Sequence, residues 1–339
     1  MNFMIIDKLK RPVRDLRISV TDKCNFRCHY CMPEEIFGHK YEFLSKDKIL
    51  TFEETTRLVK LFVQLGVHKI RITGGEPLLR QELDVLVQML SKVSGIDDIA
   101  LTTNGYFLKE KAKILKDAGL KRLTISLDTL DPELFKKMAG RHLELHRVLE
   151  GIDHAAELEF FPIKINTVLQ RDVNDQEILK LSAFAKNNGH IIRFIEYMDV
   201  GNLNGWRMDD VVTAQEIIEV ISSKWSIEPI DKNYKGEVAN RYRYLDGSGE
   251  FGIIASVTQP FCGDCTRARL SADGKIYTCL FANTGFDVMT PMREGASEKE
   301  LFEMLQSLWL ERIDRYSEER LSSTDTSSER KVEMYQIGG

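Results

Sequence analysis

Proline is scarce in this sequence, with 8 residues in 339, and no segment of strongly biased composition interrupts the chain. The hydrophobic fraction of 43% and the charged fraction of 29% are typical of globular proteins, which excludes the disordered, collagen-like and low-complexity classes. The longest stretch without a charged residue, 251–263, has 13 residues, whereas a membrane-spanning helix needs roughly 20 apolar residues. We therefore expect no membrane association and either one large α/β barrel or two domains.

An excess of positive charge is also absent, because the formal net charge at pH 7 is -5. Proteins that bind a phosphate backbone over a broad surface are usually basic, so we expect no nucleic-acid partner. Residues Met1 to Asp7 contain neither a basic leader nor an apolar run long enough for a secretion signal, which predicts a cytoplasmic protein. Any anionic ligand must then be bound by a local cluster of lysine and arginine side chains.

Cysteine is rare, and the six cysteines form two groups of three. The first triad has the spacing C-x3-C-x2-C and the second the spacing C-x2-C-x13-C; their members are Cys24, Cys28 and Cys31, and Cys262, Cys265 and Cys279. A closed structural zinc site takes four ligands, and His29 has little freedom to be the fourth because it lies between two of the cysteines. Three thiolates on a [4Fe-4S] cluster would leave one iron open, as a catalytic metal site requires.

Strands and helices alternate through the first two hundred residues. Helical segments such as Phe52 to Leu65, which ends at Gly66, separate short strands rich in β-branched residues. The six predicted strands are Asp15–Thr21, Lys69–Thr73, Asp98–Asn104, Arg122–Asp128, Pro162–Leu169 and Ile191–Met198. This alternation predicts parallel strands joined by right-handed crossovers.

One face of these strands is polar, which is unusual for a parallel sheet. In the first strand Leu16 and Ile18 alternate with Arg17 and Ser19, and the other strands repeat the pattern. The apolar face should contact the helices, so the polar face must line the inside of a curved sheet. The sequence therefore predicts an α/β fold, an incomplete (βα)6 TIM-like barrel with a polar cavity.

A second region begins after the sixth strand. The loop 199–205 is a plausible boundary, which gives a partial barrel at 1–200, a C-terminal α+β region at 201–310 and a polar tail at 311–339. In the second region we predict a helix near 214–223 and strands near 242–245, 251–257, 267–270 and 276–279. The last two strands are joined by a hairpin signal at Ser271 to Gly274 and carry the second triad. The charged, Ser- and Thr-rich segment 311–331 is typical of a mobile tail.

Five basic residues lie on the predicted barrel strands: Arg17, Lys69, Arg71, Lys164 and Arg193. Their charges would repel one another in a cavity unless a polyanion is bound, and a triphosphate fits this requirement. The sequence contains neither a P-loop nor a GxGxxG motif, so a nucleotide would be held by side chains. We also expect one or two of the five to form internal salt bridges with Asp15, Glu76, Asp128 or Glu196.

Two motifs resemble those of radical S-adenosylmethionine enzymes. The segment Cys24 to Cys31, CNFRCHYC, follows the first predicted strand, and Thr73 to Pro77, TGGEP, follows the second. With the second triad and the final Gly338 and Gly339, nearly the whole chain resembles the family that cyclises GTP in molybdenum-cofactor biosynthesis. The resemblance implies a lyase with two [4Fe-4S] clusters and S-adenosylmethionine, whose product is 3',8-cyclo-7,8-dihydro-GTP.

The resemblance also implies roles for single residues. The residues expected to contact S-adenosylmethionine are Tyr30, Gly75, Ser126 and Met198, which without the cysteines would be interpreted as turn, barrel and core residues. The residues expected to bind GTP are Arg17, Lys69, Arg71, Thr102, Lys164, Arg193, Arg267, Ala268 and Arg269. The catalytic group is Arg267, Arg269, Gly338 and Gly339, and the alternatives for these are a solvated strand edge and a mobile chain end.

The implied partners are an electron donor, a downstream cyclic pyranopterin monophosphate synthase and a second copy of the chain in a homodimer. Two other functions remain open. A radical enzyme acting on a peptide can also carry auxiliary clusters, although it usually has more cysteines. A non-enzymatic iron-sulfur carrier or a zinc-held binding module is the other alternative, and it leaves the basic cavity unexplained.

Overall fold

The barrel strands form one continuous sheet in the computed structural model, which describes residues 5–320 and 331–338. The strand order is β12-β11-β10-β1-β2-β3-β4-β5-β6-β9-β8-β7. The barrel strands are β1 (Asp15–Ser19), β2 (Lys69–Thr73), β3 (Asp98–Thr103), β4 (Arg122–Ser126), β5 (Lys164–Leu169) and β6 (Ile191–Glu196). The other strands are β7 (Ile227–Ile230), β8 (Asn240–Tyr244), β9 (Glu250–Ile254), β10 (Arg267–Leu270), β11 (Lys275–Tyr277) and β12 (Phe286–Asp287).

Eight of these strands form a parallel core. Strands β1 to β6 pair in sequence order, β10 pairs parallel with β1, and β9 pairs parallel with β6. The antiparallel β11–β12 and β8–β7 then extend the two sides, so that β12 and β7 end an open sheet. The predicted partial barrel is confirmed, and the C-terminal region contributes two parallel strands to it.

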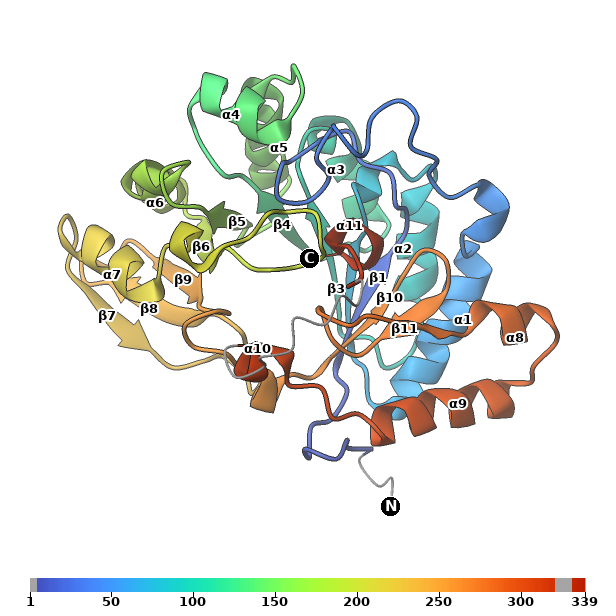
Figure 1. Ribbon diagram of the computed structural model, residues 1–339. Helices are drawn as coiled ribbons and strands as arrows, with labels where there is room; N and C mark the ends of the chain where they lie inside the picture. Colours follow the sequence, from blue (N-terminus) through green and yellow to red (C-terminus); the bar gives the residue numbers. More distant parts are fainter. Residues whose placement is uncertain (1–4, 321–330, 339) are drawn as a thin grey trace.

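Helices cover the outside of the sheet, as Figure 1 shows for α1, α2, α3, α5 and α6. The helices are α1 (Phe52–Leu65), α2 (Leu83–Ser91), α3 (Leu108–Asp117), α4 (Pro132–Ala139), α5 (Leu145–Glu157), α6 (Ile178–Asn187), α7 (Ala214–Ser222), α8 (Met289–Arg293), α9 (Glu298–Leu310), α10 (Tyr316–Glu319) and α11 (Met334–Ile337). A capping box at Thr51 begins α1, and Gly66, with φ 117°, ends it as predicted. No described helix has the length and apolar character needed to cross a membrane.

The alternation of the strands is confirmed by their burial. Leu16 and Ile18 belong to the main hydrophobic core, whereas Arg17 between them lines an internal cavity. The core joins the outer faces of the strands to the helices, so the inner faces are left for polar groups. The barrel thus combines an apolar outer layer with a polar interior.

The region after residue 200 differs from its prediction in several places. The predicted boundary lies in the loop after β6, but strands on both sides of it belong to one sheet. Sequence patterns missed β7 and the 13-residue α9, whose capping box begins at Ser297. The segment expected to be mobile from 311 onwards contains buried Arg312, and Val332 and Tyr335 beyond it are also buried. Residues 321–330 lie outside the described part.

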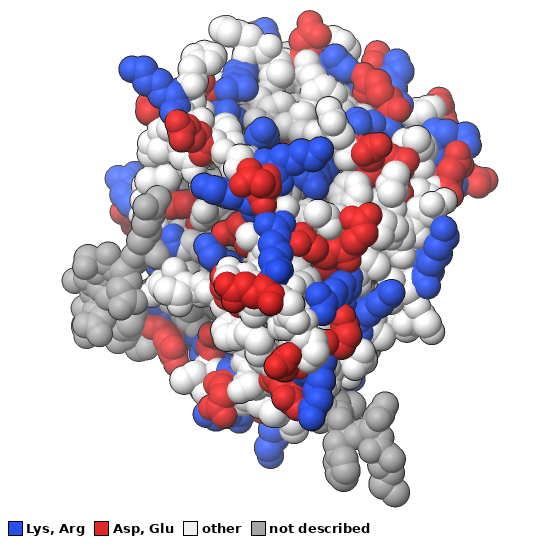
Figure 2. Space-filling view, turned by 90° about the vertical axis from the view of Figure 1, so that its right-hand side faces the viewer, with Lys and Arg blue, Asp and Glu red and all other residues white. Residues whose placement is uncertain are grey.

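Basic and acidic side chains are mixed on one outer face of the molecule (Figure 2). Figure 2 shows lysine and arginine side chains interspersed with acidic ones on this face, which is the right-hand side of Figure 1. Arg57 of α1 pairs with Glu298 of α9, and Arg293 of α8 pairs with Glu54 at 2.7 Å. These ion pairs connect the C-terminal helices to the barrel.

Candidate functional site

The first triad lies in the loop that follows β1, and an arginine holds this loop in shape. Buried Arg27 donates hydrogen bonds to the backbone oxygens of Phe37 at 2.7 Å and Cys24 at 2.8 Å. Burial raises the pKa of Cys28, and negative charge on Cys24 and Cys31 raises it further. Thiolates are stable in such a site only beside a cation, and the ligand type fits an iron-sulfur cluster.

The loop after β2 packs directly against this cysteine loop because it contains two glycines. A Cβ at position 74 would lie 2.5 Å from the Thr21 carbonyl oxygen, and one at position 75 would overlap the Lys23 carbonyl. The Gly75 amide donates to Thr21 O and the Glu76 amide to Lys23 O, both at 2.8 Å. The TGGEP motif therefore brings a backbone edge beside the first triad, as its resemblance implied.

Glu76 anchors the other side of that loop. Its carboxylate accepts hydrogen bonds from the Thr103 hydroxyl at 2.6 Å and the Asn104 amide at 2.8 Å, and burial raises its pKa to about 7. Asn104 also directs its side-chain amide towards the Cys24 sulfur, at 3.9 Å. The ends of β2 and β3 are thus tied to the first triad.

The remaining residues implied for S-adenosylmethionine lie at the carboxyl ends of other strands. The Tyr30 hydroxyl donates to Asp128 Oδ2 at 2.7 Å, and burial raises the pKa of that carboxyl. Ser126 is the last residue of β4 and is half-buried. Met198 lies just after β6 and lines the barrel cavity. Asp128 was expected only as a salt-bridge partner. Its position two residues after Ser126 was the sequence feature that could have placed it beside Tyr30.

A large group of side chains lines a cavity in the barrel interior. Ten basic and four acidic side chains line it. Seven of the basic ones form no ion pair with any described residue: Arg17, Lys69, Arg71, Lys164, Arg193, Arg267 and Arg269. A cavity with this excess of unpaired positive charge can bind a polyanion.

The expectation of internal salt bridges for one or two strand residues is therefore wrong. The four acidic residues proposed as partners accept hydrogen bonds from neutral groups instead. Glu196, for example, accepts from the amides of Ala214 and Val257 and from the Thr258 side chain, and Asp15 accepts from the Thr266 hydroxyl at 2.9 Å. Neutral donors satisfy these carboxylates, so the strand cations remain available for a ligand.

The positive charges in the cavity are destabilised by burial and by their mutual repulsion. Burial lowers the pKa of Arg17 well below its usual value, and neighbouring arginines lower it further. The same causes lower the pKa of Lys164 to about 8 and that of Arg193 to about 9. The Nε groups of Arg193, Arg267 and Arg269 are buried without a hydrogen-bond partner. Unsatisfied buried donors are costly, and phosphate oxygens would satisfy them.

The second triad opens into the same cavity, at the amino-terminal end of β10. Cys262, Cys265 and Cys279 all line the cavity, and Arg267 donates to Cys265 Sγ at 3.5 Å. Burial alone would raise the pKa of Cys265, but Arg267 and Arg312 outweigh it and lower the pKa to about 5. A thiolate at this position is suited to bind iron.

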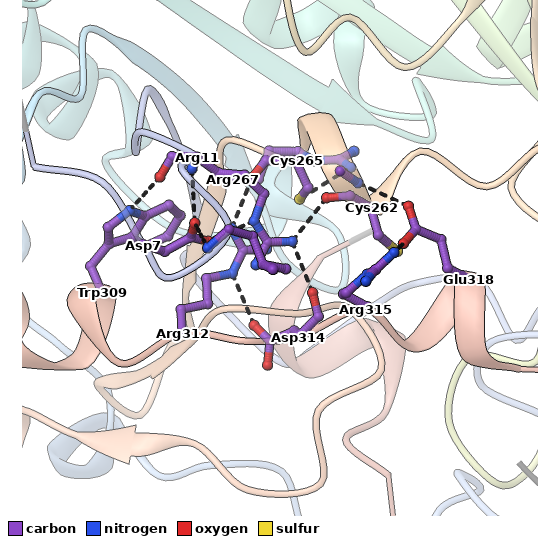
Figure 3. Close-up of polar contacts among 12 residues, drawn as sticks. Asp7, Arg11, Cys262, Cys265, Arg267, Trp309, Arg312, Asp314, Arg315 and Glu318 are labelled. Carbon is purple, nitrogen blue, oxygen red and sulfur yellow. Dashed lines mark hydrogen bonds and ion pairs between the residues drawn. The ribbon is translucent and has the colours of Figure 1, made fainter.

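Two further arginines hold the backbone of the second triad (Figure 3). Arg11 donates to the Cys262 carbonyl and Arg312 to the Cys265 carbonyl, both at 2.8 Å. Arg11 pairs with Asp7 at 2.6 Å and Arg312 pairs with Asp314 at 2.9 Å. Charge-assisted hydrogen bonds from buried groups fix the loop geometry, so the segments near residues 10 and 312 belong to the site.

A single tetrahedral ion does not match either triad. Among residues 5–320 and 331–338, no three His, Cys, Asp or Glu side chains converge on a position for one metal ion. The thiolates of an iron-sulfur cluster bind different irons, so they need not converge on one point. Three cysteine thiols are a donor set that an iron-sulfur cluster can take, and each triad supplies three.

The end of the described chain enters the barrel between the two triads. Tyr335 packs with Met32 and Phe37 beside the first triad, and its hydroxyl lies 2.7 Å from that of Tyr41. Helix α11 contacts β1, and Figure 1 shows α11 in the middle of the view. Gly338 is buried against Thr73, where a Cβ would overlap the threonine side chain. Gly339 lies outside the described residues.

Comparisons with known proteins agree with this geometry. Residues 18–185 match the model of the Radical SAM superfamily, and residues 190–318 match that of Molybdenum Cofactor Synthesis C. The chain is 54% identical to a protein named GTP 3',8-cyclase from Acidothermus cellulolyticus and 50% identical to one from Staphylococcus saprophyticus, with 99% of each chain covered in both cases. The chain belongs to the GTP 3',8-cyclase family. Membership of the radical SAM superfamily implies a [4Fe-4S] cluster and S-adenosylmethionine.

Two solved structures resemble this member of the GTP 3',8-cyclase family in fold. Streptococcus suis SuiB bound to the precursor peptide SuiA has a TM-score of 0.61 at 16% identity and covers 93% of this chain and 68% of its own. Native anSMEcpe with bound AdoMet also has a TM-score of 0.61, at 15% identity, and covers 95% and 94%. These likenesses confirm the partial-barrel fold.

Sequence reasoning missed one cavity residue of this cyclase-family chain. Arg122 lines the cavity and pairs with Asp98, and the period-two pattern of its strand was the signal that could have placed it there. The side chain of Ala268, which was expected at the substrate, packs in the hydrophobic core on the opposite face from Arg267 and Arg269, so that expectation stays a prediction. Thr102 lies in the cavity as expected and accepts a hydrogen bond from Arg71 at 3.2 Å.

Proposed function

We propose that this chain uses S-adenosylmethionine to cyclise GTP to 3',8-cyclo-7,8-dihydro-GTP in molybdenum-cofactor biosynthesis, a lyase reaction. The observation that carries the proposal is the set of seven unpaired basic side chains in a cavity that also contains the second cysteine triad. A triphosphate supplies the anionic oxygens that this set lacks. The full-length identity to proteins named GTP 3',8-cyclase supports the same substrate.

Cys24, Cys28 and Cys31 would hold a [4Fe-4S] cluster that leaves one iron for S-adenosylmethionine. When bound, these groups supply the reductive radical chemistry that removes a hydrogen atom from the ribose. The chain's own residues orient the cofactor: the backbone at Gly75 faces its methionine end, and Tyr30, Ser126 and Met198 contact the remainder. The Tyr30 to Asp128 hydrogen bond keeps the tyrosine ring in one orientation.

Cys262, Cys265 and Cys279 would hold a second [4Fe-4S] cluster against the guanine end of GTP. Arg17, Lys69, Arg71, Lys164 and Arg193 bind the triphosphate, and Thr102 adds a hydroxyl near Arg71. Arg267 and Arg269 project from alternate positions of β10 towards the reacting part of the nucleotide. Gly338, which lies against Thr73, would offer a backbone dipole to the substrate together with Gly339, which lies outside the described residues. Enclosure in the barrel keeps solvent from reactive carbon centres.

The wider assignment follows the family. We propose a cytoplasmic homodimer that receives electrons from an electron donor and passes its product to a downstream cyclic pyranopterin monophosphate synthase. We expect no nucleic-acid partner, and the face in Figure 2, where basic and acidic side chains are mixed, is compatible with this expectation.

Anaerobic turnover tests the proposed function. The reconstituted protein is incubated with dithionite, S-adenosylmethionine and either GTP, guanosine or no substrate, and the nucleosides are separated by mass spectrometry. We expect 5'-deoxyadenosine and an isomerised guanine nucleotide in equal amounts, and we expect them only in the incubation that contains GTP. The proposal would be contradicted if GTP did not change the cleavage of S-adenosylmethionine and if no cyclised nucleotide formed.

Lys164 should make GTP binding depend on pH. Its pKa is lowered to about 8 by burial and by the nearby charges of Arg193, Arg122 and Arg71, so it loses its proton as the pH rises through that value. Because the protonated form binds phosphate, we expect the affinity for GTP to fall about tenfold between about pH 7 and about pH 9. Equilibrium dialysis without S-adenosylmethionine measures this change.

Lys164→Arg is the matched control because a guanidinium holds its proton more strongly than an ammonium in the same surroundings, and Arg193, whose pKa is lowered to about 9, titrates in both proteins. Titration of the guanine base affects both proteins equally and cancels in the comparison. Equal pH profiles for the parent and Lys164→Arg would show that Lys164 does not contact the phosphates.

A further inference from the structure

The loop between β7 and β8, residues 231–239, covers the amino-terminal end of the barrel. Tyr234 and Glu237 line the large cavity, and Asn233 lines a smaller one that it shares with Arg122 and Lys164. Arg122 and Lys164 are the first residues of β4 and β5. The loop therefore lies over the ends of the strands that carry several of the cavity cations.

The loop turns one carboxylate inwards. The Tyr234 ring lies on Lys69, with the ammonium nitrogen 3.4 Å from the ring centroid. The Glu237 amide donates to the Tyr234 carbonyl at 3.1 Å, and the Asn233 amide donates to Glu237 Oε2 at 2.7 Å. Tyr234 is 39% exposed, whereas Glu237 is 8% exposed. A turn within the loop thus holds Glu237 inside, while the Tyr234 ring lies on Lys69 and is partly exposed.

Among the four acidic residues that line the cavity, Glu237 and Asp15 form no ion pair with a described residue, and these two differ in where their hydrogen-bond donors come from. Asp98 and Asp314 pair with Arg122 and Arg312, and Asp15 accepts the Thr266 hydroxyl. Glu237 forms no ion pair with any described residue, and its hydrogen-bond donor belongs to its own loop.

The charge of Glu237 nevertheless acts on the cavity. It favours the protonated forms of Lys69, Lys164 and Arg193, against the burial and the like charges that disfavour them. A carboxylate that faces several cations without a direct contact to any one of them offsets their mutual repulsion, and it can leave without breaking an ion pair.

We propose that Glu237 is a displaceable counter-ion of the polyphosphate site, which the loop 231–239 carries away from the cavity when a polyphosphate binds. A phosphate chain and a buried carboxylate repel each other, so both cannot occupy this end of the barrel at low cost. The free energy needed to displace Glu237 is the same for every anion. A chain of three phosphates offsets it with many contacts, whereas a single phosphate does not, so Glu237 protects the empty site from small anions. The identity of the polyphosphate as part of GTP rests on the proposed function, but the displacement does not.

The test measures binding of inorganic tripolyphosphate and of inorganic phosphate to the anaerobic, cluster-loaded protein and to Glu237→Gln. Glutamine keeps the oxygen that accepts the Asn233 amide and removes the charge. We expect both anions to bind about tenfold more tightly to Glu237→Gln, with the difference decreasing as salt is added. Equal or weaker binding of both anions would show that Glu237 is a structural acceptor and would overturn the proposal.

Glu228→Gln is the matched control. It removes one carboxylate from β7 of the same hairpin, where Glu228 is half-buried, pairs with Arg243 and does not line the cavity, and it should leave both affinities unchanged. A similar gain in this variant would indicate a general effect of net charge and would also overturn the proposal.

Hydrogen exchange gives a second measurement that needs no substitution. In the parent protein, tripolyphosphate should accelerate exchange in peptides covering 231–239 while it protects those of β2 and β5. Protection of the loop would mean that it closes on the anion and would contradict displacement. These experiments use neither GTP nor turnover, so a protein that binds tripolyphosphate as described but forms no cyclised nucleotide would sink the proposed function alone.

Discussion

Cys28→Ala is expected to abolish cleavage of S-adenosylmethionine, whereas Cys265→Ala is expected to abolish cyclisation only. Cys28 lies within the first triad, whose other two thiols act on its pKa, and the Arg27 loop and the TGGEP loop converge there. Without Cys28 the first cluster loses one of three ligands and the site for S-adenosylmethionine is lost. We expect 5'-deoxyadenosine formation to fall at least a thousandfold.

Cys265 lies at the other end of the cavity, in a loop held by Arg11 and Arg312. Its removal leaves the first triad and its supporting hydrogen bonds unchanged, so we expect Cys265→Ala to form 5'-deoxyadenosine without cyclised nucleotide. Nucleoside analysis by mass spectrometry separates the two products.

Iron content provides the control for this pair of variants. Each variant should keep about half of the iron of the parent protein, with the spectrum of the cluster that remains. Complete loss of iron in both variants would mean that the two triads form one structural site. Full cyclisation by Cys265→Ala would remove the second triad from the mechanism.

Gly338→Ala is expected to reduce cyclised product at least a hundredfold while both clusters remain. Gly338 is buried against Thr73, the residue before the TGGEP glycines, and an added methyl group would overlap the threonine side chain. The last turn would then leave its position near the first triad, although Tyr335 and Ile337 still anchor α11. Product is measured by mass spectrometry, and circular dichroism and iron content report on folding.

Gly189→Ala is a matched control for this substitution. Gly189 has φ 67° and Gly338 has φ 68°, so both variants place a side chain at positive φ, but a Cβ at position 189 meets no atom within 4 Å. Full activity in Gly189→Ala with loss in Gly338→Ala would show that positive φ at a glycine is not sufficient for the effect and that the loss belongs to the position of Gly338 against Thr73. Equal activity of Gly338→Ala and the parent would show that the end of the chain is not part of the reaction.

Local patterns were sufficient to predict the barrel strands. The predicted first strand, Asp15–Thr21, corresponds to β1 at Asp15–Ser19, and the second coincides with β2. The strands end earlier than the alternation suggests, because Thr21 already belongs to the loop that packs on Gly74. Helix α9 was missed since its Ser- and Glu-rich surroundings resemble a solvated tail, although its capping box was present in the sequence.

The salt bridges could not be predicted from residue types. The candidate partners for the strand cations were Asp15, Glu76, Asp128 and Glu196. These carboxylates accept hydrogen bonds from amides and hydroxyls instead. Glu196 is the clearest case, since its partners Ala214 and Val257 come from segments beyond the barrel. Which donor meets a buried carboxylate depends on backbone geometry, and sequence spacing does not describe that geometry.

The sequence by itself determined the two thiol triads, the polar inner face of the barrel and the basic residues on it, because these follow from spacing and from the period of a strand. Only the tertiary structure decided that Arg11 holds the Cys262 loop across 251 residues, that β9 and β10 complete the parallel sheet, and that Glu237 faces the cations. The physical reason is that such contacts join segments far apart in the chain. Their partners are selected when the sheet curves and the apolar faces are buried, and no local pattern records that choice.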